Sequence, residues 1–169
     1  MMASPDRRAT LTVGLGVAAA VIVLDQLSKA LILAVLAGAG LDQRIGVAPV
    51  FDLVLAFNRG VSFGLFNAPS GGGRFEGLVF SLVAGAIVVG LVWWLARAAN
   101  LLLSVAIGLI VGGAVGNVLD RVRFGAVVDF LDFHVGSWHW PAFNLADSAI
   151  CVGVAAMLLD GLLLRRGPS

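Results

Sequence analysis

The chain has 169 residues, of which 60% are hydrophobic and 12% charged, and its formal net charge is +1. Soluble domains carry about 25% charged residues, so this composition and a mean hydropathy of +1.02 indicate an integral membrane protein with a single domain, 1–169. The sequence contains no basic run, which excludes nucleic acid as a partner. The single cysteine, Cys151, lies in an apolar run and cannot build a disulfide framework or a cysteine metal site.

Four apolar stretches reach the length of about 20 residues that a membrane-spanning helix needs. We predict four transmembrane helices at about 11–37, 78–95, 100–118 and 145–164, with larger loops at about 38–77 and 119–144. Arg7 and Arg8 precede the first stretch as they would precede a cleaved signal peptide, but the apolar core of such a peptide has roughly 7–15 residues. This stretch is longer and carries Asp25 and Lys29, so we expect an uncleaved span.

The orientation of the spans is predicted from the arginines near their ends. The numbers on the two sides are equal, but the arginines of one side are concentrated in the two short chain ends and the tight turn around Arg97. We therefore expect both termini in the cytoplasm and both larger loops outside it. Trp138 and Trp140 of the second loop would then lie at the outer membrane interface, where tryptophan is enriched.

The two loops carry strand-like segments. Val47–Phe57 is rich in Val, Phe and Leu and is predicted to be one strand, followed by a turn at Asn58–Gly60 and a returning strand at Val61–Phe66. Phe130–Trp140 is predicted to be a further extended piece. We expect these segments to form a small sheet on the outer membrane surface.

Two aspartates stand out by their surroundings. Asp129 lies in a short apolar run, and Asp147 lies three residues after Asn144, which is a natural N-cap for the fourth helix. A capping box is therefore the competing interpretation for Asp147. If the two carboxylates meet, they cannot both ionise comfortably, so the pKa of one would rise. One protonated and one ionised carboxylate is the arrangement with which aspartic proteases activate water.

Other polar residues fall at the ends of the predicted spans. Asp25 and Lys29 are four residues apart and share one helix face, either as a structural ion pair or as a direct part of a site. The third span carries Gly108, Gly112 and Gly116 at the spacing that lets helix backbones approach closely. Directly after them come Asn117, Asp120 and Arg121, a polar cluster that is either functional or merely solvated.

A metal site is not expected. His134 and His139 are five residues apart with Asp132 close by, but a metal needs three or four convergent ligands and the loop offers no further one.

Five motif blocks carry a resemblance to a known family. The chain resembles the bacterial lipoprotein signal peptidase, also called signal peptidase II or prolipoprotein signal peptidase, over nearly its whole length. The blocks are Leu24–Lys29, Asn58–Gly64, Gly112–Arg121, Gly125–Phe130 and Phe143–Ser148. The chain departs from the family at Val61 and Ser62, where members commonly carry alanine.

The resemblance implies a monomeric, multi-pass aspartyl endopeptidase of the bacterial cytoplasmic (inner) membrane with its active site at the extracytoplasmic face. Its substrate would be a prolipoprotein whose lipobox cysteine carries diacylglycerol, and it would cut just before that cysteine. The family uses no metal or organic cofactor, contacts membrane lipid, cradles its substrate with the small sheet and is inhibited by the cyclic peptide globomycin. The resemblance places the catalytic dyad on Asp129 and Asp147 and the supporting residues on Asp25, Lys29, Asn58, Gly60, Asn117, Asp120, Arg121 and Asn144.

Two other functions remain open from composition alone. A small four-helix transporter or channel would use Asp25, Lys29 and Asp147 as an ion relay. Such a relay should distribute carboxylates through the membrane thickness, whereas the polar residues here are expected at one end and not in the inner half. A structural membrane subunit would not require a pair of aspartates with three placed asparagines.

Overall fold

Helices and a small sheet make up the described structure. The computed structural model describes residues 7–36, 44–59, 74–98 and 100–164. Gly60 and the strand predicted for Val61–Phe66 lie outside these ranges. The helices are α1 (Arg7–Leu36), α2 (Arg74–Leu95), α3 (Leu101–Phe124) and α4 (Leu145–Leu164), and the strands are β1 (Arg44–Ala48), β2 (Phe51–Asn58), β3 (Val127–Val135) and β4 (Trp138–His139).

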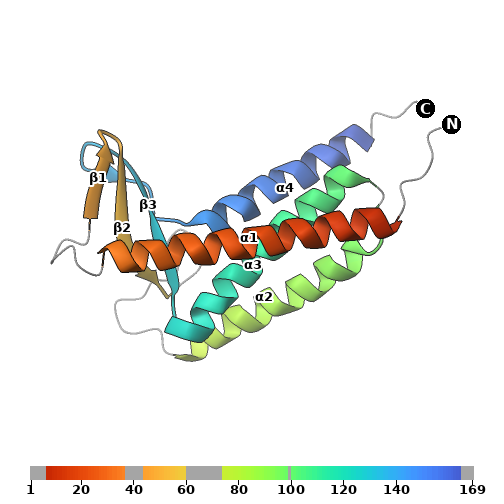
Figure 1. Cartoon of the computed structure of the whole chain (residues 1–169), viewed down its shortest axis with the longest axis horizontal. Coiled ribbons are helices and arrows are strands. Elements are labelled where there is room, and N and C mark those ends of the chain that lie inside the picture. Colours follow the sequence, from red (N-terminus) through yellow and green to blue (C-terminus); the bar gives the residue numbers. More distant parts are fainter. Residues whose placement is uncertain (1–6, 37–43, 60–73, 99, 165–169) are drawn as a thin grey trace.

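The helices run side by side, and the sheet lies at one end of them (Figure 1). The first turn of α1 and the last turn of α4 lie at the opposite end (Figure 1). Among the described residues, three helices are long and apolar enough to cross a membrane, namely α1, α3 and residues 145–162 of α4. The described apolar part of α2, Val79–Leu95, is shorter, so its crossing of the membrane stays a prediction.

Helix α3 occupies the centre of the bundle and contacts α1, α2 and α4. Its glycines permit this close packing, as predicted for the glycine ridge. A Cβ on Gly112 would lie 2.7 Å from the carbonyl oxygen of Ala18, and one on Gly116 would lie 2.6 Å from Oδ2 of Asp25. A buried apolar core fills the space between α1, α2 and α3 and is formed by Ala18, Leu95, Ala98, Leu103, Ile107 and Val111.

The end of α3 differs from the prediction. We expected a loop from Leu119, but the helix continues to Phe124 and ends at Gly125, whose φ of +70° suits glycine. The charged residues after position 119 therefore extend the helix beyond its apolar part. Because the helix continues, Asn117 and Arg121 are one turn apart on the same helix, and Arg121 Nη1 donates to the Asn117 carbonyl at 3.4 Å.

The sheet also differs from the prediction in its first strand. Instead of one strand over Val47–Phe57, β1 and β2 form an antiparallel hairpin that turns at Pro49 and Val50. Proline has no backbone N–H to donate to a neighbouring strand, so it ends β1. Within the described ranges the strands are antiparallel in the order β1-β2-β3-β4. The extended segment predicted for Phe130–Trp140 is confirmed by β3 and β4.

The expectation that the polar residues lie only at one end of the bundle is wrong, because a buried carboxylate lies at the other end. Asp160 near the end of α4 is buried and accepts a hydrogen bond from Nδ2 of Asn100 at 2.8 Å. Asn100 is also the N-cap of α3, where its Oδ1 accepts the Leu103 N–H. Asp160 therefore ties the end of α4 to the beginning of α3, far from the sheet (Figure 1).

Candidate active site

Asp129 lies on β3, facing the end of the helix bundle, and its exposed fraction is 2%. Two asparagine amides hold its carboxylate. Nδ2 of Asn58, at the end of β2, donates to Oδ2 at 3.0 Å, and Nδ2 of Asn144 donates to Oδ1 at 2.7 Å. Register places Asn58 opposite Val127 on the neighbouring strand, which brings its side chain to Asp129.

Asp147 lies in the first turn of α4 and is equally buried, with an exposed fraction of 4%. Oδ1 of Asn144 accepts the backbone N–H of Asp147 at 2.9 Å, so Asn144 is the predicted N-cap and Asp147 the third helical residue. The Asp147 carboxylate accepts a hydrogen bond from Nδ2 of Asn117 at 2.9 Å. Asp147 is therefore part of a helix cap and of the polar cluster at the same time.

A chain of amides connects the two carboxylates. Nδ2 of Asn144 lies 3.2 Å from Oδ1 of Asn117, so the two asparagines link Asp129 to Asp147. The pKa of Asp129 is raised to about 7, first by burial and then by the negative charge of Asp147. The hydrogen bonds from Asn58 and Asn144 and the charge of Lys29 oppose this rise. The Asp129 carboxyl group therefore changes between its protonated and its ionised form near neutral pH.

Asp25 and Lys29 form part of a buried ion cluster behind the two asparagines. Nζ of Lys29 lies 2.8 Å from Oδ2 of Asp25 and 2.8 Å from Oδ2 of Asp120, and all three side chains are buried. The same ammonium donates to Oδ1 of Asn117 at 3.2 Å. The ion pair predicted for α1 is thus present, and it extends to Asp120 and contacts the amide chain that joins the two aspartates.

Each carboxylate of this cluster also accepts a hydrogen bond from the backbone N–H of the residue that precedes a candidate catalytic aspartate. Oδ1 of Asp25 accepts the N–H of Ala146 at 3.0 Å, and Ala146 directly precedes Asp147. Oδ2 of Asp120 accepts the N–H of Val128 at 3.1 Å, and Val128 directly precedes Asp129. The cluster therefore fixes the backbone of α4 directly before Asp147 and the backbone of β3 directly before Asp129.

Arg121 brings a second positive charge to the site. Its guanidinium interacts electrostatically with the carboxylates of Asp147, Asp129 and Asp120. Of the supporting residues expected from the sequence, the structure brings all of those it describes to one site; Gly60 is the exception, because it lies outside the described ranges.

Gln26 belongs to the site but was not predicted. Its amide nitrogen donates to Oδ1 of Asp120 at 2.9 Å. Its place inside the Leu24–Lys29 block, next to Asp25, was the only signal in the sequence. Glutamine is uncharged and its residue type alone does not indicate a site, so Gln26 is recognised only by its contacts with Asp25 and Asp120.

A second charged cluster lies in the sheet. Asp52 and Asp132 are direct cross-strand partners, and Nη1 of Arg44 lies 2.9 Å from Oδ2 of Asp52. Nδ1 of His139 lies 2.9 Å from Oδ2 of Asp132, and its ring stacks on that of His134. Among the described residues, no group of three or more His, Cys, Asp or Glu side chains has the geometry to hold a metal ion.

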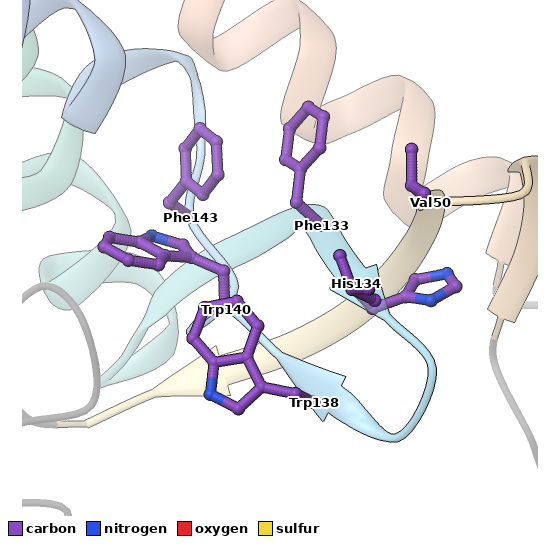
Figure 2. Close-up of a pocket in the computed structure, with 7 residues that line it drawn as sticks. Val50, Phe133, His134, Trp138, Trp140 and Phe143 are labelled. Atoms are coloured by element: carbon purple, nitrogen blue, oxygen red, sulfur yellow. The ribbon is translucent and has the colours of Figure 1, made fainter.

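An apolar pocket of about 460 Å³ opens beside the site, on the sheet. In Figure 2 the rings of Phe133 and Phe143 lie next to each other along its wall, with centroids 6.0 Å apart. Phe143 directly precedes Asn144, and its backbone pairs with Leu131 on β3. The pocket is therefore joined rigidly to the residue that links the two aspartates. Its lining consists of Val50, Phe133, His134, Val135, Trp138, Trp140 and Phe143.

The family model and the curated relatives that match this chain name one family. The family model for signal peptidase (SPase) II matches residues 17–163. The lipoprotein signal peptidase of Paraburkholderia phymatum is 46% identical over 154 residues, covering 90% of this chain and 89% of the relative. That of Methylobacterium sp. (strain 4-46) is 48% identical over 150 residues, covering 89% and 88%. A solved bacterial membrane enzyme has a TM-score of 0.76 at 28% identity and covers 92% of this chain and 91% of its own. The chain therefore belongs to the signal peptidase II family and is a membrane protease of that family.

Proposed function

We propose that the chain is an aspartyl endopeptidase that removes the signal peptide from prolipoproteins and cuts before a lipobox cysteine that carries diacylglycerol. The observation that supports this most is the buried pair Asp129 and Asp147, joined through Asn144 and Asn117. Two carboxylates with different environments and one shared proton are the requirement for aspartyl protease chemistry. The names of the curated relatives support the substrate class.

In the proposed mechanism Asp129 holds the proton and Asp147 is ionised. The N-terminus of α4 favours a negative charge at Asp147, while burial raises the pKa of Asp129 to about 7. Asp147 takes a proton from a water molecule, whose oxygen attacks the scissile carbonyl carbon, while Asp129 donates its proton to the carbonyl oxygen. When the tetrahedral intermediate collapses, Asp147 returns its proton to the leaving nitrogen of the cysteine and Asp129 regains its own from the hydroxyl.

The surroundings support this chemistry. The positive charge of Arg121 interacts electrostatically with both aspartates and stabilises the charge that develops during attack. The amide of Asn58 orients the Asp129 carboxyl group. An extended peptide in lipid needs hydrogen-bond partners for its backbone, and the edge of the sheet and the asparagines of the site offer them.

We further propose the membrane arrangement predicted from the sequence. The four helices cross the cytoplasmic (inner) membrane with both termini in the cytoplasm, and the sheet and the dyad lie at the extracytoplasmic face, where water and the substrate's scissile bond meet. The apolar pocket beside Asn144 would lie in the outer leaflet interface, as would Trp138 and Trp140. The enzyme acts as a monomer without metal or organic cofactor and is inhibited by globomycin.

The test is cleavage of a defined substrate. Full-length protein in detergent is mixed with one prolipoprotein in two forms, with and without diacylglycerol on the lipobox cysteine, and the products are weighed by mass spectrometry. We expect cleavage of the lipidated form, with the cysteine as the first residue of the larger product. Asp160→Asn is the matched control, because Asp160 is a buried carboxylate at the opposite end of the bundle, and it should cleave like the wild type. Equal cleavage of both forms, or a cut elsewhere, would contradict the proposed specificity.

A further inference from the structure

Gln26 occupies a bridging position between the two carboxylates that anchor the site. Its Nε2 donates to Oδ1 of Asp120 at 2.9 Å and lies 3.2 Å from Oδ2 of Asp25. Its Oε1 accepts a hydrogen bond from Nη1 of Arg123 at 2.8 Å. Nε2 also lies 3.3 Å from the carbonyl oxygen of Gly116. Arg123 therefore fixes the orientation of the amide, with the oxygen turned to the exposed side and the nitrogen turned to the buried acceptors.

The two bridged carboxylates govern the two candidate catalytic residues separately. Asp25 holds the N–H of Ala146, next to Asp147, and Asp120 holds the N–H of Val128, next to Asp129. A change in the separation of Asp25 and Asp120 therefore shifts α4 relative to β3. The distance between the Asp129 and Asp147 carboxylates follows that shift, because each is one residue from its anchor.

Lys29 and Gln26 connect the same two carboxylates in different ways. Lys29 contributes the positive charge and contacts Oδ2 of both Asp25 and Asp120. An ammonium group is a point charge that accepts many geometries. Gln26 instead contacts Oδ1 of Asp120, the oxygen that neither Lys29 nor Val128 contacts in these interactions, and so limits the rotation of that carboxylate.

We infer that Gln26 is a positioning residue for peptide cleavage: by bridging Asp25 and Asp120 it sets the separation of Asp129 and Asp147. This inference rests on the proposed function for its catalytic consequence, whereas its structural consequence is measurable without substrate. When the Gln26 amide is removed, only Lys29 still connects Asp25 and Asp120. Their like charges then increase their separation, and the two catalytic carboxylates move apart with them.

Two variants of Gln26 separate the hydrogen bonds from packing. Gln26→Met keeps the length of the side chain and removes the amide, and Gln26→Glu keeps the shape and replaces the donors by a third carboxylate. We expect kcat to fall about ten- to hundredfold in Gln26→Met, with KM changed less than about twofold, because misplacement by about 1 Å has this effect on reacting groups. Gln26→Glu should lose more. Arg123→Met, which frees only the exposed side of the amide, should change kcat in the same direction by less.

The matched control is Ser28→Ala. Ser28 lies two residues away on α1, and within the described residues its hydroxyl donates to a backbone carbonyl of its own helix, that of Asp25, at 2.8 Å. It should keep the kcat of the wild type. The melting temperature of each variant is measured alongside, so that loss of folded protein is not counted as loss of kcat.

The second readout is the titration of Asp129, followed by NMR of the full-length protein with ¹³C-labelled aspartate carboxyl groups, with the signal assigned by its loss in Asp129→Asn. The charge of Asp147 contributes to the raised pKa of Asp129, so the pKa should fall in Gln26→Met and stay unchanged in Ser28→Ala. A wild-type kcat together with a wild-type titration in both Gln26 variants would overturn the inference. If the wild type fails to cleave but the titration shifts as expected, the inference on positioning holds and the proposed function fails.

Discussion

The side-chain amide of Asn144 donates to the carboxylate of Asp129 at 2.7 Å, which places the first residue before α4 in direct contact with the middle of the sheet. The other end of the same amide caps α4 through the N–H of Asp147. One side chain therefore contacts both the carboxylate of Asp129 and the backbone of Asp147, and these two roles can be separated by mutation.

Replacing Asn144 should affect stability and cleavage to different degrees. Asn144→Ser keeps a capping oxygen but cannot reach Asp129, so we expect near wild-type melting and a large loss of cleavage. Asn144→Ala also loses the cap, which costs about 0.5–2 kcal/mol of stability. Melting temperature and kcat are measured for both variants. Full cleavage by Asn144→Ser would show that the contact with Asp129 is dispensable.

The raised pKa of Asp129 predicts the pH dependence of cleavage. If Asp129 donates a proton to the scissile carbonyl, kcat/KM should fall as the pH rises through about 7. The check is a pH profile in detergent with one lipidated substrate. An activity that keeps rising from pH 7 to pH 9 would contradict a protonated Asp129.

The same pKa predicts how folding stability depends on pH. The folded state binds the Asp129 proton more tightly than the unfolded state, since its pKa is raised from 3.8 to about 7. Stability from this group is therefore present at low pH and is lost as the pH rises between those two values. The wild-type melting temperature should fall more between pH 5 and pH 8 than that of Asp129→Asn, which has no group to titrate there. Parallel curves would refute the raised pKa.

Two neighbouring residues, Asn58 and Arg59, should respond differently to alanine. Asn58 is buried and donates to Asp129 at 3.0 Å, whereas the side chain of Arg59 is exposed. We expect Asn58→Ala to lower kcat by more than tenfold, because a buried polar group left without its hydrogen bond costs about 1–3 kcal/mol. Arg59→Ala should be much milder. The reverse order would place the important contact on Arg59.

The glycines of α3 offer a test of packing against the site. A Cβ on Gly116 would meet the Asp25 carboxylate at 2.6 Å, and one on Gly112 would meet the backbone oxygen of Ala18 at 2.7 Å. Gly116→Ala should therefore lower kcat by disturbing the ion cluster, and Gly112→Ala should lower the melting temperature by separating α1 from α3. Gly90→Ala on α2, where nothing lies within 4 Å of the added Cβ, is the control and should lose neither.

The sequence predicted those features of the site that depend on local order along the chain. The N-cap at Asn144 follows from residue type and from the apolar run after it, and the structure shows that cap. The glycine spacing on the third span predicted close packing because every fourth residue of a helix lies on one face, and the structure places those glycines against α1.

Some of the features that the sequence did not predict depend on pairing between distant segments, and others are local. Asp52 and Asp132 meet because β2 and β3 pair in one particular register. The sequence predicts a single strand over Val47–Phe57, whereas β1 and β2 form a hairpin that turns at Pro49 and Val50. The sequence predicts a loop from Leu119, whereas helix α3 continues to Phe124 and ends where Gly125 permits a left-handed turn. The role of Gln26 depends on two carboxylates. Asp25 is its neighbour in the sequence, but Asp120 is 94 residues away, so their meeting is visible only in the folded chain.

The most direct test of the central claim is single-turnover cleavage of a lipidated prolipoprotein by the wild type, Asp129→Asn and Asp147→Asn, with Asp160→Asn as the control. The variants are first shown to be folded by their melting temperatures. We predict cleavage by the wild type and by Asp160→Asn, and none above background by either Asp129→Asn or Asp147→Asn. Full cleavage by a folded Asp129→Asn or Asp147→Asn would contradict the assignment of the dyad.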